Sequence, residues 1–304
     1  MSDAMSDAMN GAAATGTPFP SFVGIGALKA GSTFLDGLLR SHPGLCLPSS
    51  VKEVDFFSRH YDRGPQWYRE QFDRCTVRRH GEVSPRYLVE AAGPARLAAA
   101  NPDAQLLLLV RDPVERAFSQ YKHRVRTTRY RAGFDEYLAA SPGVLDRGRY
   151  CYHAGRYLER FERDRLHVIV FEDLVSEPLA TVQEVYRFLG VDDGYVPDRY
   201  DTPANESWQP SRQRTYVLAK AMSRGLHDRG LGRAAAALSR SPMAGWLAGR
   251  HVHMGVEPMS EAAVGRLRDA YRGEVEGLSG LLRRDLAELW WARRPERVGR
   301  AAAR

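Results

Sequence analysis

Lysine is scarce in this chain of 304 residues, which holds only Lys29, Lys52, Lys122 and Lys220. Arginine therefore supplies most of the positive charge behind a formal net charge of +7. A basic balance fits either an anionic ligand in a basic cleft or a nucleic acid. Because arginine in place of lysine mainly reflects a GC-rich genome, the total charge does not decide between the two.

Cysteine is also rare, and Cys46, Cys75 and Cys151 are far apart with no metal-binding spacing. We interpret them as buried reduced thiols of a cytosolic protein and predict no metal site. No apolar run reaches the roughly 18 residues that a membrane-spanning helix needs. The N-terminus lacks the basic and then apolar pattern of a secretory signal. We therefore expect a cytoplasmic protein with no transmembrane segment.

The chain is predicted to form one domain. Residues 1–17 repeat small polar residues and are predicted to be a disordered tail. Residues 18–295 contain no dividing linker and no internal repeat, and 43% of the chain is hydrophobic, enough for a sizeable core. Residues 296–304 are predicted to be a basic C-terminal tail. The sequence gives no prediction of oligomeric state.

Short apolar runs alternate with helical patterns along the first half of the chain. Strands are predicted at Phe22–Ile25, Leu106–Val110 and Leu166–Val170, and the continuous apolar run of Leu106–Val110 is typical of a strand covered on both faces. Helices are predicted at 32–40 and 150–161. Strands that alternate with helices indicate a parallel sheet of about five strands between helical layers.

A further helix is predicted to start with Asp112 as N-cap and Pro113 at its first position. Beyond about residue 210 only helical patterns are found, and the last is amphipathic over 260–291. The predicted fold class is thus α/β, a three-layer fold with a central parallel sheet and helical C-terminal additions.

The first predicted strand leads into residues 26–33, which read GALKAGST. The two glycines have P-loop spacing and Thr33 is in place, but Ser32 occupies the usual lysine position and Lys29 lies inside the loop. A glycine-bounded loop before a helix binds anions through backbone N–H groups, so the fold is P-loop-like. The displaced lysine suits a donor that has one phosphate and a terminal sulfate and therefore no γ-phosphate. Such a donor needs a cation at its bridging oxygen, where negative charge grows as the sulfate leaves. The alternative is a glycine-rich turn with an exposed lysine.

A second anion site is predicted where the second strand ends, at Arg111. Ligands of open α/β sheets bind at the carboxyl ends of strands. Ser119 lies two turns into the helix that follows, and an arginine and a hydroxyl can share one phosphate. The alternative is a salt bridge from Arg111 to Asp112 or Glu115.

Four segments in this order resemble the PAPS-dependent sulfotransferase superfamily, nearest to the branch of heparan sulfate O- and N-sulfotransferases and many bacterial sulfotransferases. They are residues 26–33, 52–57 (KEVDFF), 82–87 (EVSPRY) and 111–119 (RDPVERAFS). The resemblance extends from about Phe22 to Trp291. It implies transfer of a sulfuryl group from 3′-phosphoadenosine 5′-phosphosulfate (PAPS), by in-line displacement and without a metal, to a hydroxyl or less readily an amine.

The resemblance also implies roles for single residues. Glu53 matches the general base, and Lys29 would stabilise the leaving phosphate. The 5′-phosphosulfate would be bound by Lys29, Ala30, Gly31, Ser32 and Thr33. Arg111 and Ser119 would bind the 3′-phosphate. The alternative for Glu53 is a surface glutamate paired to Lys52.

Some positions depart from the resembled pattern. Relatives often carry histidine in place of Asp55 and lysine in place of Val83, both near the acceptor, which disfavours a polysaccharide. A late lysine-glycine-arginine loop is also lacking; Arg212 is the predicted substitute for donor binding, with Arg214 and plain surface arginines as alternatives. The acceptor stays open among small molecules, glycolipids and carbohydrates. The arginine bias suggests a bacterium in which natural products or glycans are sulfated.

Two other function classes remain as alternatives. A P-loop kinase using ATP is disfavoured by Ser32 in the lysine position and by the lack of a strand-end aspartate for magnesium. A basic nucleic-acid-binding protein is disfavoured because no helix-turn-helix, zinc or aromatic-platform motif occurs. We therefore predict no nucleic-acid partner.

Overall fold

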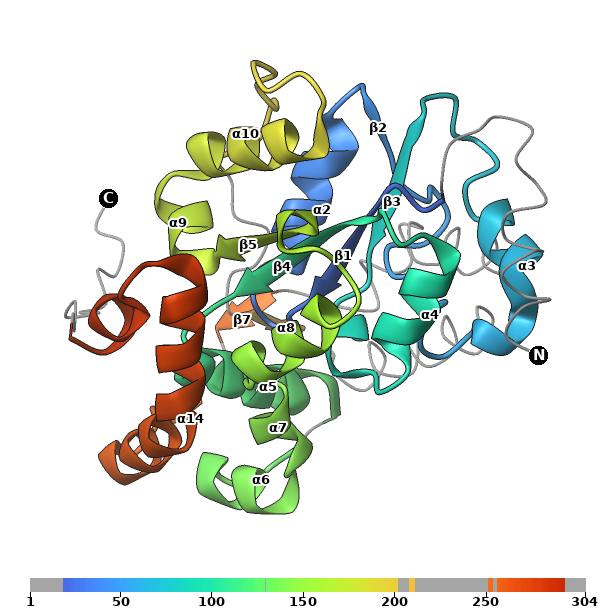
Figure 1. Cartoon of the computed structure of the whole chain (residues 1–304). Helices are drawn as coiled ribbons and strands as arrows, with labels where there is room; N and C mark the ends of the chain where they lie inside the picture. The colour runs from blue at the N-terminus through green and yellow to red at the C-terminus, as the bar shows by residue number, and fades with distance from the viewer. Residues whose placement is uncertain (1–18, 129, 202–207, 211–250, 254–255, 293–304) are drawn as a thin grey trace, which may run out of the picture.

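A computed structural model of the chain describes residues 19–128, 130–201, 208–210, 251–253 and 256–292. Its centre is a five-stranded sheet in the order β2-β3-β1-β4-β5 (Figure 1). The strands are β1 (Phe22–Gly26), β2 (Leu45–Cys46), β3 (Arg79–Val83), β4 (Gln105–Val110) and β5 (Leu166–Val170). All neighbouring strands are parallel, which confirms the predicted sheet.

Helices connect these strands. The α-helices of the described residues are α2 (Ser32–Ser41), α3 (Gly64–Glu70), α4 (Gly93–Ala100), α5 (Pro113–Thr128), α6 (Phe134–Ala140), α7 (Gly143–Asp146), α8 (Tyr150–Leu158), α9 (Phe171–Ser176), α10 (Pro178–Leu189) and α14 (Glu261–Leu282). The shorter turns are the 3-10 helices η1 (Tyr61–Arg63), η2 (Tyr87–Val89) and η3 (Arg163–Arg165) and the π-helix η4 (Glu288–Ala292).

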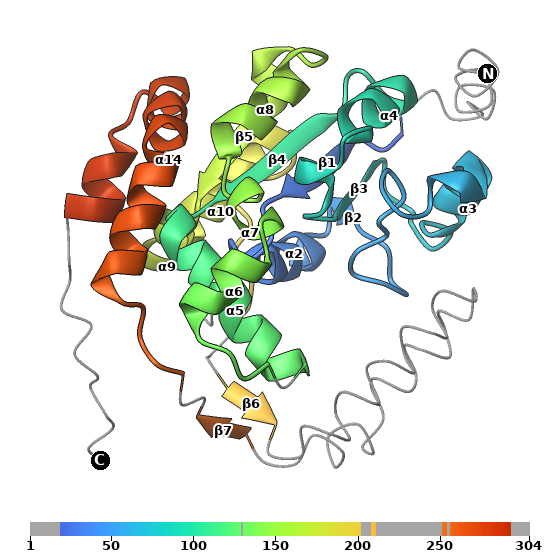
Figure 2. The same ribbon diagram turned by 90° about the horizontal axis from the view of Figure 1, so that it is seen from below.

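Helices cover both faces of the sheet, which confirms the three predicted layers (Figures 1 and 2). On one face lie α2 and α10, where the Tyr186 hydroxyl donates to the Leu38 carbonyl at 2.8 Å. On the other face lie α4 and α8, and the Tyr157 hydroxyl of α8 donates to the Tyr87 carbonyl of η2 at 2.9 Å. The sheet is therefore buried on both sides, as the continuous apolar run of β4 predicts.

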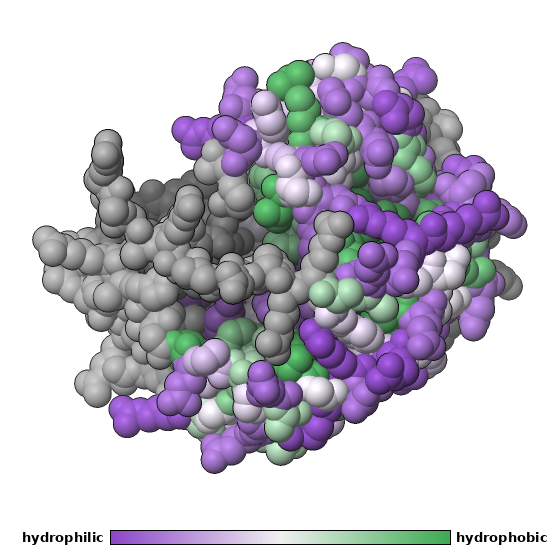
Figure 3. Space-filling model, turned by 90° about the vertical axis from the view of Figure 1, so that its left-hand side faces the viewer, coloured by the Kyte–Doolittle hydropathy of each residue, from purple (hydrophilic) through white to green (hydrophobic). Residues whose placement is uncertain are grey.

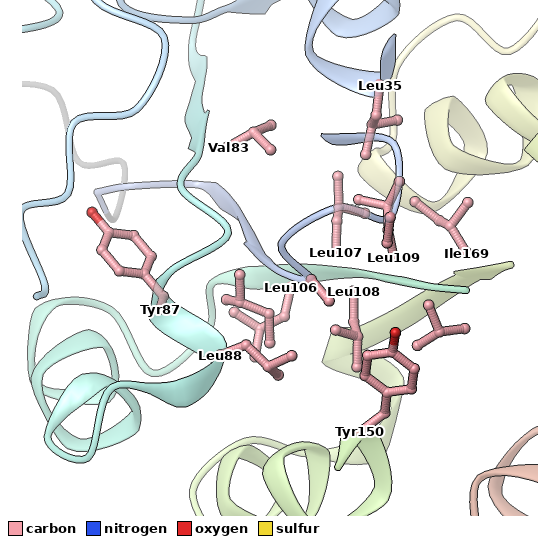
Figure 4. Packing of buried hydrophobic residues seen from close by; sticks show 14 of the residues in the cluster. Leu35, Val83, Tyr87, Leu88, Leu106, Leu107, Leu108, Leu109, Tyr150 and Ile169 are labelled. Carbon is pink, nitrogen blue, oxygen red and sulfur yellow. The ribbon is translucent and has the colours of Figure 1, made fainter. Parts of the chain in front are cut away.

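Alternate leucines of β4 fill both layers of the core. Leu107 points toward Leu35 of α2, and Leu108 points toward Tyr150 of α8 (Figure 4). All four of these side chains are at most 1% exposed. Burying one such leucine stabilises the fold by about 1.5–3 kcal/mol. This packing fixes the strand ends that carry the site.

The helix after β4 starts as predicted. The Val114 N–H donates to Asp112 Oδ1 at 2.9 Å, so Asp112 caps α5 and Pro113 occupies the first helical position. Burial raises the pKa of Asp112 to about 6, and the bond from Val114 opposes that shift.

Among the described residues beyond 207, a long helix follows a short strand pair. Ser260 caps α14 by accepting the Ala263 N–H at 3.1 Å, and the helix lies within the predicted 260–291 segment. However, β6 (Trp208–Pro210) and β7 (His251–His253) form an antiparallel pair, so the prediction of helical patterns alone beyond residue 210 is wrong. Each strand has three residues, too few for an alternating pattern to show.

The prediction of three reduced thiols is also wrong. Cys46 of β2 and Cys75, which follows α3, form a disulfide with their Cα atoms 5.6 Å apart, while Cys151 is free. The two cysteines are 29 residues apart in sequence, and the pairing of β2 with β3 places Cys46 opposite His80, shortly after Cys75 in the chain. A disulfide is typical of an oxidising compartment.

The surface over α9, α14 and their neighbours is mostly hydrophilic, with small apolar areas (Figure 3). Within the described ranges, no helix is both long and apolar enough to cross a bilayer.

Candidate active site

The loop between β1 and α2 has the backbone of an anion site. Lys29 and Gly31 have φ values of 70° and 97°, in the left-handed region. A Cβ on Gly31 would lie 2.8 Å from the Phe171 ring, so glycine is required there. Non-glycine residues in this region cost about 1–3 kcal/mol and concentrate at functional sites. The left-handed residues therefore mark this loop as a candidate functional site.

The start of α2 adds N–H donors to the loop. Gly31 is the N-cap and supplies no side-chain hydrogen bond, so the first backbone N–H groups of the helix lack a capping partner. Ala30 and Ser32 are buried, whereas Thr33 is exposed. The positive end of the helix dipole lies at this position. The start of α2 therefore offers backbone N–H groups beside the loop, and the role of residues 29–33 in donor binding stays a prediction.

Lys52 joins this loop to the segment that carries Glu53. The Lys52 ammonium donates to Glu53 Oε1 at 3.0 Å and to Ser32 Oγ at 3.4 Å. The side chains of Lys52 and Glu53 are 28% and 39% exposed, so the pair can open to an incoming ligand. The alternative interpretation, a glutamate paired to Lys52, describes this ion pair correctly. An exposed pair contributes only about 0–1 kcal/mol to stability.

A buried carboxylate, that of Glu82, accepts a hydrogen bond from the segment that carries Glu53. Glu82 is fully buried on β3 and accepts the Tyr68 and Tyr87 hydroxyls, both at 2.8 Å. It also accepts the Ser84 hydroxyl and, at 3.2 Å, the Val54 backbone N–H. Burial raises the pKa of Glu82 to about 7, although the three hydroxyl donors lower it. Glu82 therefore fixes the backbone next to Glu53.

Glu82 is the first residue of the 82–87 segment, and the sequence predicts no role for it. The signal that could have found it is a glutamate inside a strand, followed at 84 and 87 by hydroxyl-bearing residues. Which tyrosines reach it depends on η2 and α3, which local patterns did not predict.

Asp55 lies at a turn of the chain two residues after Glu53. Its φ is 55°, so the chain turns there, and its N–H donates to Ser84 Oγ at 3.2 Å. Its carboxylate lies 3.5 Å from Arg86 Nε. Burial raises the pKa of Asp55, and the charge of Arg86 opposes that shift. Glu53 and Asp55 thus have separate partners.

Val83, the other departure from the resembled pattern, is fully buried. A Cβ on Gly24 of β1 would lie 2.9 Å from Val83 Cγ1, so this side chain packs in the sheet interior. Valine at this position therefore contributes to the core and offers no charge to a ligand.

The second predicted site lies beside the loop. The Arg111 guanidinium carbon is 4.7 Å from the centroid of the Phe171 ring, the same ring that confines Gly31. Arg111 also lies 3.5 Å from Glu115, which is the predicted alternative pairing. Ser119 is half-buried on α5. One aromatic side chain therefore connects the phosphate loop with Arg111.

Arg212 and Arg214 lie outside the described residues, so their contact with a donor stays a prediction. No group of three or more histidine, cysteine or acidic side chains suited to a metal ion occurs among the residues that the structure describes.

Comparison with known proteins agrees with this geometry. Residues 21–217 match the family described as sulfotransferase domain. Heparan sulfate glucosamine 3-O-sulfotransferase 3B1 of Mus musculus is 31% identical over 182 residues, which cover 57% of this chain and 46% of that protein. Membrane-associated sulfotransferase kil1 of Dictyostelium discoideum is 38% identical over 111 residues, 35% of this chain and 23% of that protein. The chain thus spans less than half of the length of these curated relatives.

A solved structure extends the similarity to the whole fold. The sulfotransferase from Alicyclobacillus acidocaldarius is 27% identical with a TM-score of 0.65, and the similarity covers 90% of this chain and 99% of that one. The predicted P-loop-like fold is confirmed by this neighbour. In this chain, Lys52 joins the loop between β1 and α2 to the segment that carries Glu53. Because the family model matches residues 21–217, the chain belongs to the sulfotransferase domain family.

Proposed function

We propose that the protein transfers a sulfuryl group from PAPS to a hydroxyl, or less readily an amine, of a small-molecule, glycolipid or carbohydrate acceptor. The observation that carries the proposal is the position of Lys52, whose ammonium contacts both Ser32 of the phosphate loop and Glu53. A donor bound at the loop would therefore lie beside a carboxylate that can accept a proton.

The described residues fit such a donor. Lys29, Ala30, Gly31, Ser32 and Thr33 form an uncapped helix start with a left-handed loop, which suits a phosphosulfate. Arg111 and Ser119 would bind the 3′-phosphate, with Arg111 stacked on Phe171. Because the Phe171 ring contacts both Arg111 and the loop at Gly31, the 3′-phosphate and the 5′-phosphosulfate would bind at neighbouring sites.

The reaction then needs one proton acceptor and one cation. Glu53 would take the proton of the acceptor hydroxyl as the oxygen–sulfur bond forms. The bond from sulfur to the bridging phosphate oxygen breaks, and Lys29 would stabilise the charge that develops on that oxygen. Positioning of the two substrates in line and this charge stabilisation would supply most of the rate enhancement.

The acceptor and the compartment are finer points. The 3-O-sulfotransferase relative is named for heparan sulfate glucosamine, which supports a carbohydrate as one acceptor class. A cytoplasmic location stays a prediction, and the Cys46–Cys75 disulfide argues for testing it. Residues 18–295 are proposed as the catalytic domain.

The test is a transfer assay with radiolabelled PAPS and a panel of alcohols, amines and sugars, in the presence of a chelator. We expect labelled product without magnesium and no phosphoryl transfer from ATP. Transfer from ATP that requires magnesium would identify a kinase. Binding to arbitrary DNA with a steep salt dependence would support the nucleic-acid alternative.

A further inference from the structure

The contacts between β4 and β5 continue past the ends of the two strands. Val110 and Val170 are the last residues that pair in register, so the backbone N–H of Asp112 lies beyond the ladder. This N–H donates to Oε1 of Glu172 at 3.3 Å. A side chain that follows β5 thus takes the place of a strand partner at the end of β4 and fixes the position of the Asp112 N–H.

The peptide unit that carries this N–H lies between the two predicted 3′-phosphate residues. A peptide unit is planar, so the bond that Asp112 donates to Glu172 also orients the carbonyl and Cα of Arg111. On its other side, Asp112 caps α5 through the 2.9 Å bond from Val114, and α5 carries Ser119. Glu172 therefore holds the junction between Arg111 and the helix of Ser119.

The other carboxylate oxygen of Glu172 is bound by the C-terminal segment, residues 284–292. Oε2 of Glu172 accepts the indole N–H of Trp290 in η4 at 2.9 Å, and Trp290 is only 6% exposed. Loss of either partner would leave a mostly buried polar group without its bond. The two oxygens of one carboxylate thus connect the C-terminal segment with the end of β4.

A second contact docks the C-terminal segment on α9. Arg284 binds both carboxylate oxygens of Asp173, with its Nη2 atom 2.9 Å from Oδ1 (Figure 1 shows α14 beside α9). Leu286, between this contact and η4 in the chain, is fully buried. The C-terminal segment lies beyond residues 21–217, which the family model matches. Its contact with Glu172 is therefore a feature of this chain that the family match does not describe.

We propose that Glu172 is a positioning residue for the 3′-phosphate of the donor, and that Trp290 of the C-terminal segment holds Glu172 in place. Both carboxylate oxygens of Glu172 are bound by protein N–H groups, so the residue acts through the peptide unit between Arg111 and Asp112. A carboxylate would itself repel a phosphate. The inference rests on the proposed function, in which Arg111 and Ser119 bind the 3′-phosphate.

The first experiment compares two ligands that differ only in the 3′-phosphate, 3′,5′-bisphosphoadenosine and adenosine 5′-monophosphate. The Kd of each is measured by calorimetry for the wild type, Trp290→Phe and Glu172→Gln. Trp290→Phe keeps an aromatic ring without the N–H, and Glu172→Gln keeps the shape with a nitrogen that cannot accept a hydrogen bond. We expect the preference for the bisphosphate to fall about threefold in Trp290→Phe and about tenfold in Glu172→Gln, the scale of one or two lost hydrogen bonds. The Kd of the monophosphate should stay unchanged.

The matched control is Tyr271→Phe, which removes one polar group from a buried aromatic side chain of α14. The Tyr271 hydroxyl donates to the carbonyl of Leu145 at 3.1 Å. Its loss should lower the free energy of unfolding and leave the preference for the bisphosphate unchanged. An equal fall of the preference in Tyr271→Phe would overturn the proposal, because general loosening of the C-terminal helices would then explain the effect.

An unchanged preference in folded Trp290→Phe, checked by circular dichroism, would also overturn the proposal, whether or not Glu172→Gln folds. If the wild type binds the two ligands equally, the 3′-phosphate site is absent and the proposed function is refuted with the positioning role. A wild-type preference that both variants retain refutes the positioning role alone.

The second experiment separates donor positioning from catalysis. With one accepted acceptor at saturation, the donor KM should rise about threefold in Trp290→Phe while kcat stays close to that of the wild type, because Glu53 and Lys29 are unchanged. A fall in kcat with an unchanged donor KM would contradict a role in binding the 3′-phosphate.

Discussion

Two glutamates in this protein differ as much in environment as two carboxylates can. Glu53 has a side chain 39% exposed and one ion pair, to Lys52. Glu82 is completely buried and accepts four hydrogen bonds. In the proposed reaction, the first would exchange its partner for a substrate proton at little cost. The second cannot move without leaving buried donors unpaired, which costs about 1–3 kcal/mol for each group.

The comparison suggests a division of labour within one site. The buried carboxylate would fix the backbone at Val54, and the exposed one, a single residue earlier, would do the chemistry. Variants of Glu53 and Glu82 separate these two roles, and variants of Lys29 and Arg111 test the donor site beside them.

The largest effect is expected at Glu53. Glu53→Gln keeps the shape but cannot accept the acceptor proton, so kcat should fall about 10²–10⁴-fold while donor affinity stays nearly unchanged. Asp55→Asn is the matched comparison and should cost less. The measurement is kcat and donor affinity for both variants with one accepted substrate. An inactive Asp55→Asn beside an active Glu53→Gln would place the base at Asp55.

Lys29 should give the next largest effect. Lys29→Ala removes a charge stabiliser from the loop, and turnover should fall about 10²–10³-fold. Lys29→Arg should not restore it, since the guanidinium fork cannot occupy the same point at a left-handed residue. Steady-state rates at saturating donor measure this. Near-normal turnover in Lys29→Ala would remove the loop from the mechanism.

Glu82 should affect stability in a pH-dependent way. Its pKa is raised from 4.5 to about 7, so the folded protein binds more protons than the unfolded chain between these values. Stability from this group therefore falls as pH rises through that window, by an amount on the order of 3 kcal/mol.

Glu82→Gln has no titrating group at this position, so its stability should lack that component. The measurement is urea unfolding of wild type and Glu82→Gln at pH 5 and 7.5, where the contributions of Asp112 and His167 are common to both and cancel. The wild type should lose stability relative to the variant between the two pH values. A constant difference would mean that Glu82 is ionised throughout.

The smallest effect concerns the second anion site. If Arg111 and Ser119 bind the 3′-phosphate, 3′,5′-bisphosphoadenosine should raise the free energy of unfolding by about 2.7 kcal/mol at one hundred times its Kd. Adenosine 5′-monophosphate should stabilise much less, and Arg111→Gln should remove most of the difference. Thermal unfolding with each ligand measures this, and equal shifts from both would withdraw the assignment.

Much of the fold could be predicted from the sequence because the signals are local. The leucine run of β4, the Asp112-Pro113 helix start and the glycine spacing of 26–33 each depend on a few neighbouring residues. For the same reason Lys29, Glu53 and Arg111 could be named as candidates. Arg212 lies outside the described residues and remains a prediction.

Tertiary structure decided the rest. The disulfide of Cys46 and Cys75 and the bonds that Tyr68 and Val54 donate to Glu82 join residues that are far apart in the chain. Sequence by itself determined which residue types are present and how the backbone is patterned locally. Which charges are buried, and beside what, depends on the pairing order of the strands and on the helices that cover them, because burial and electrostatic coupling are properties of neighbours in space.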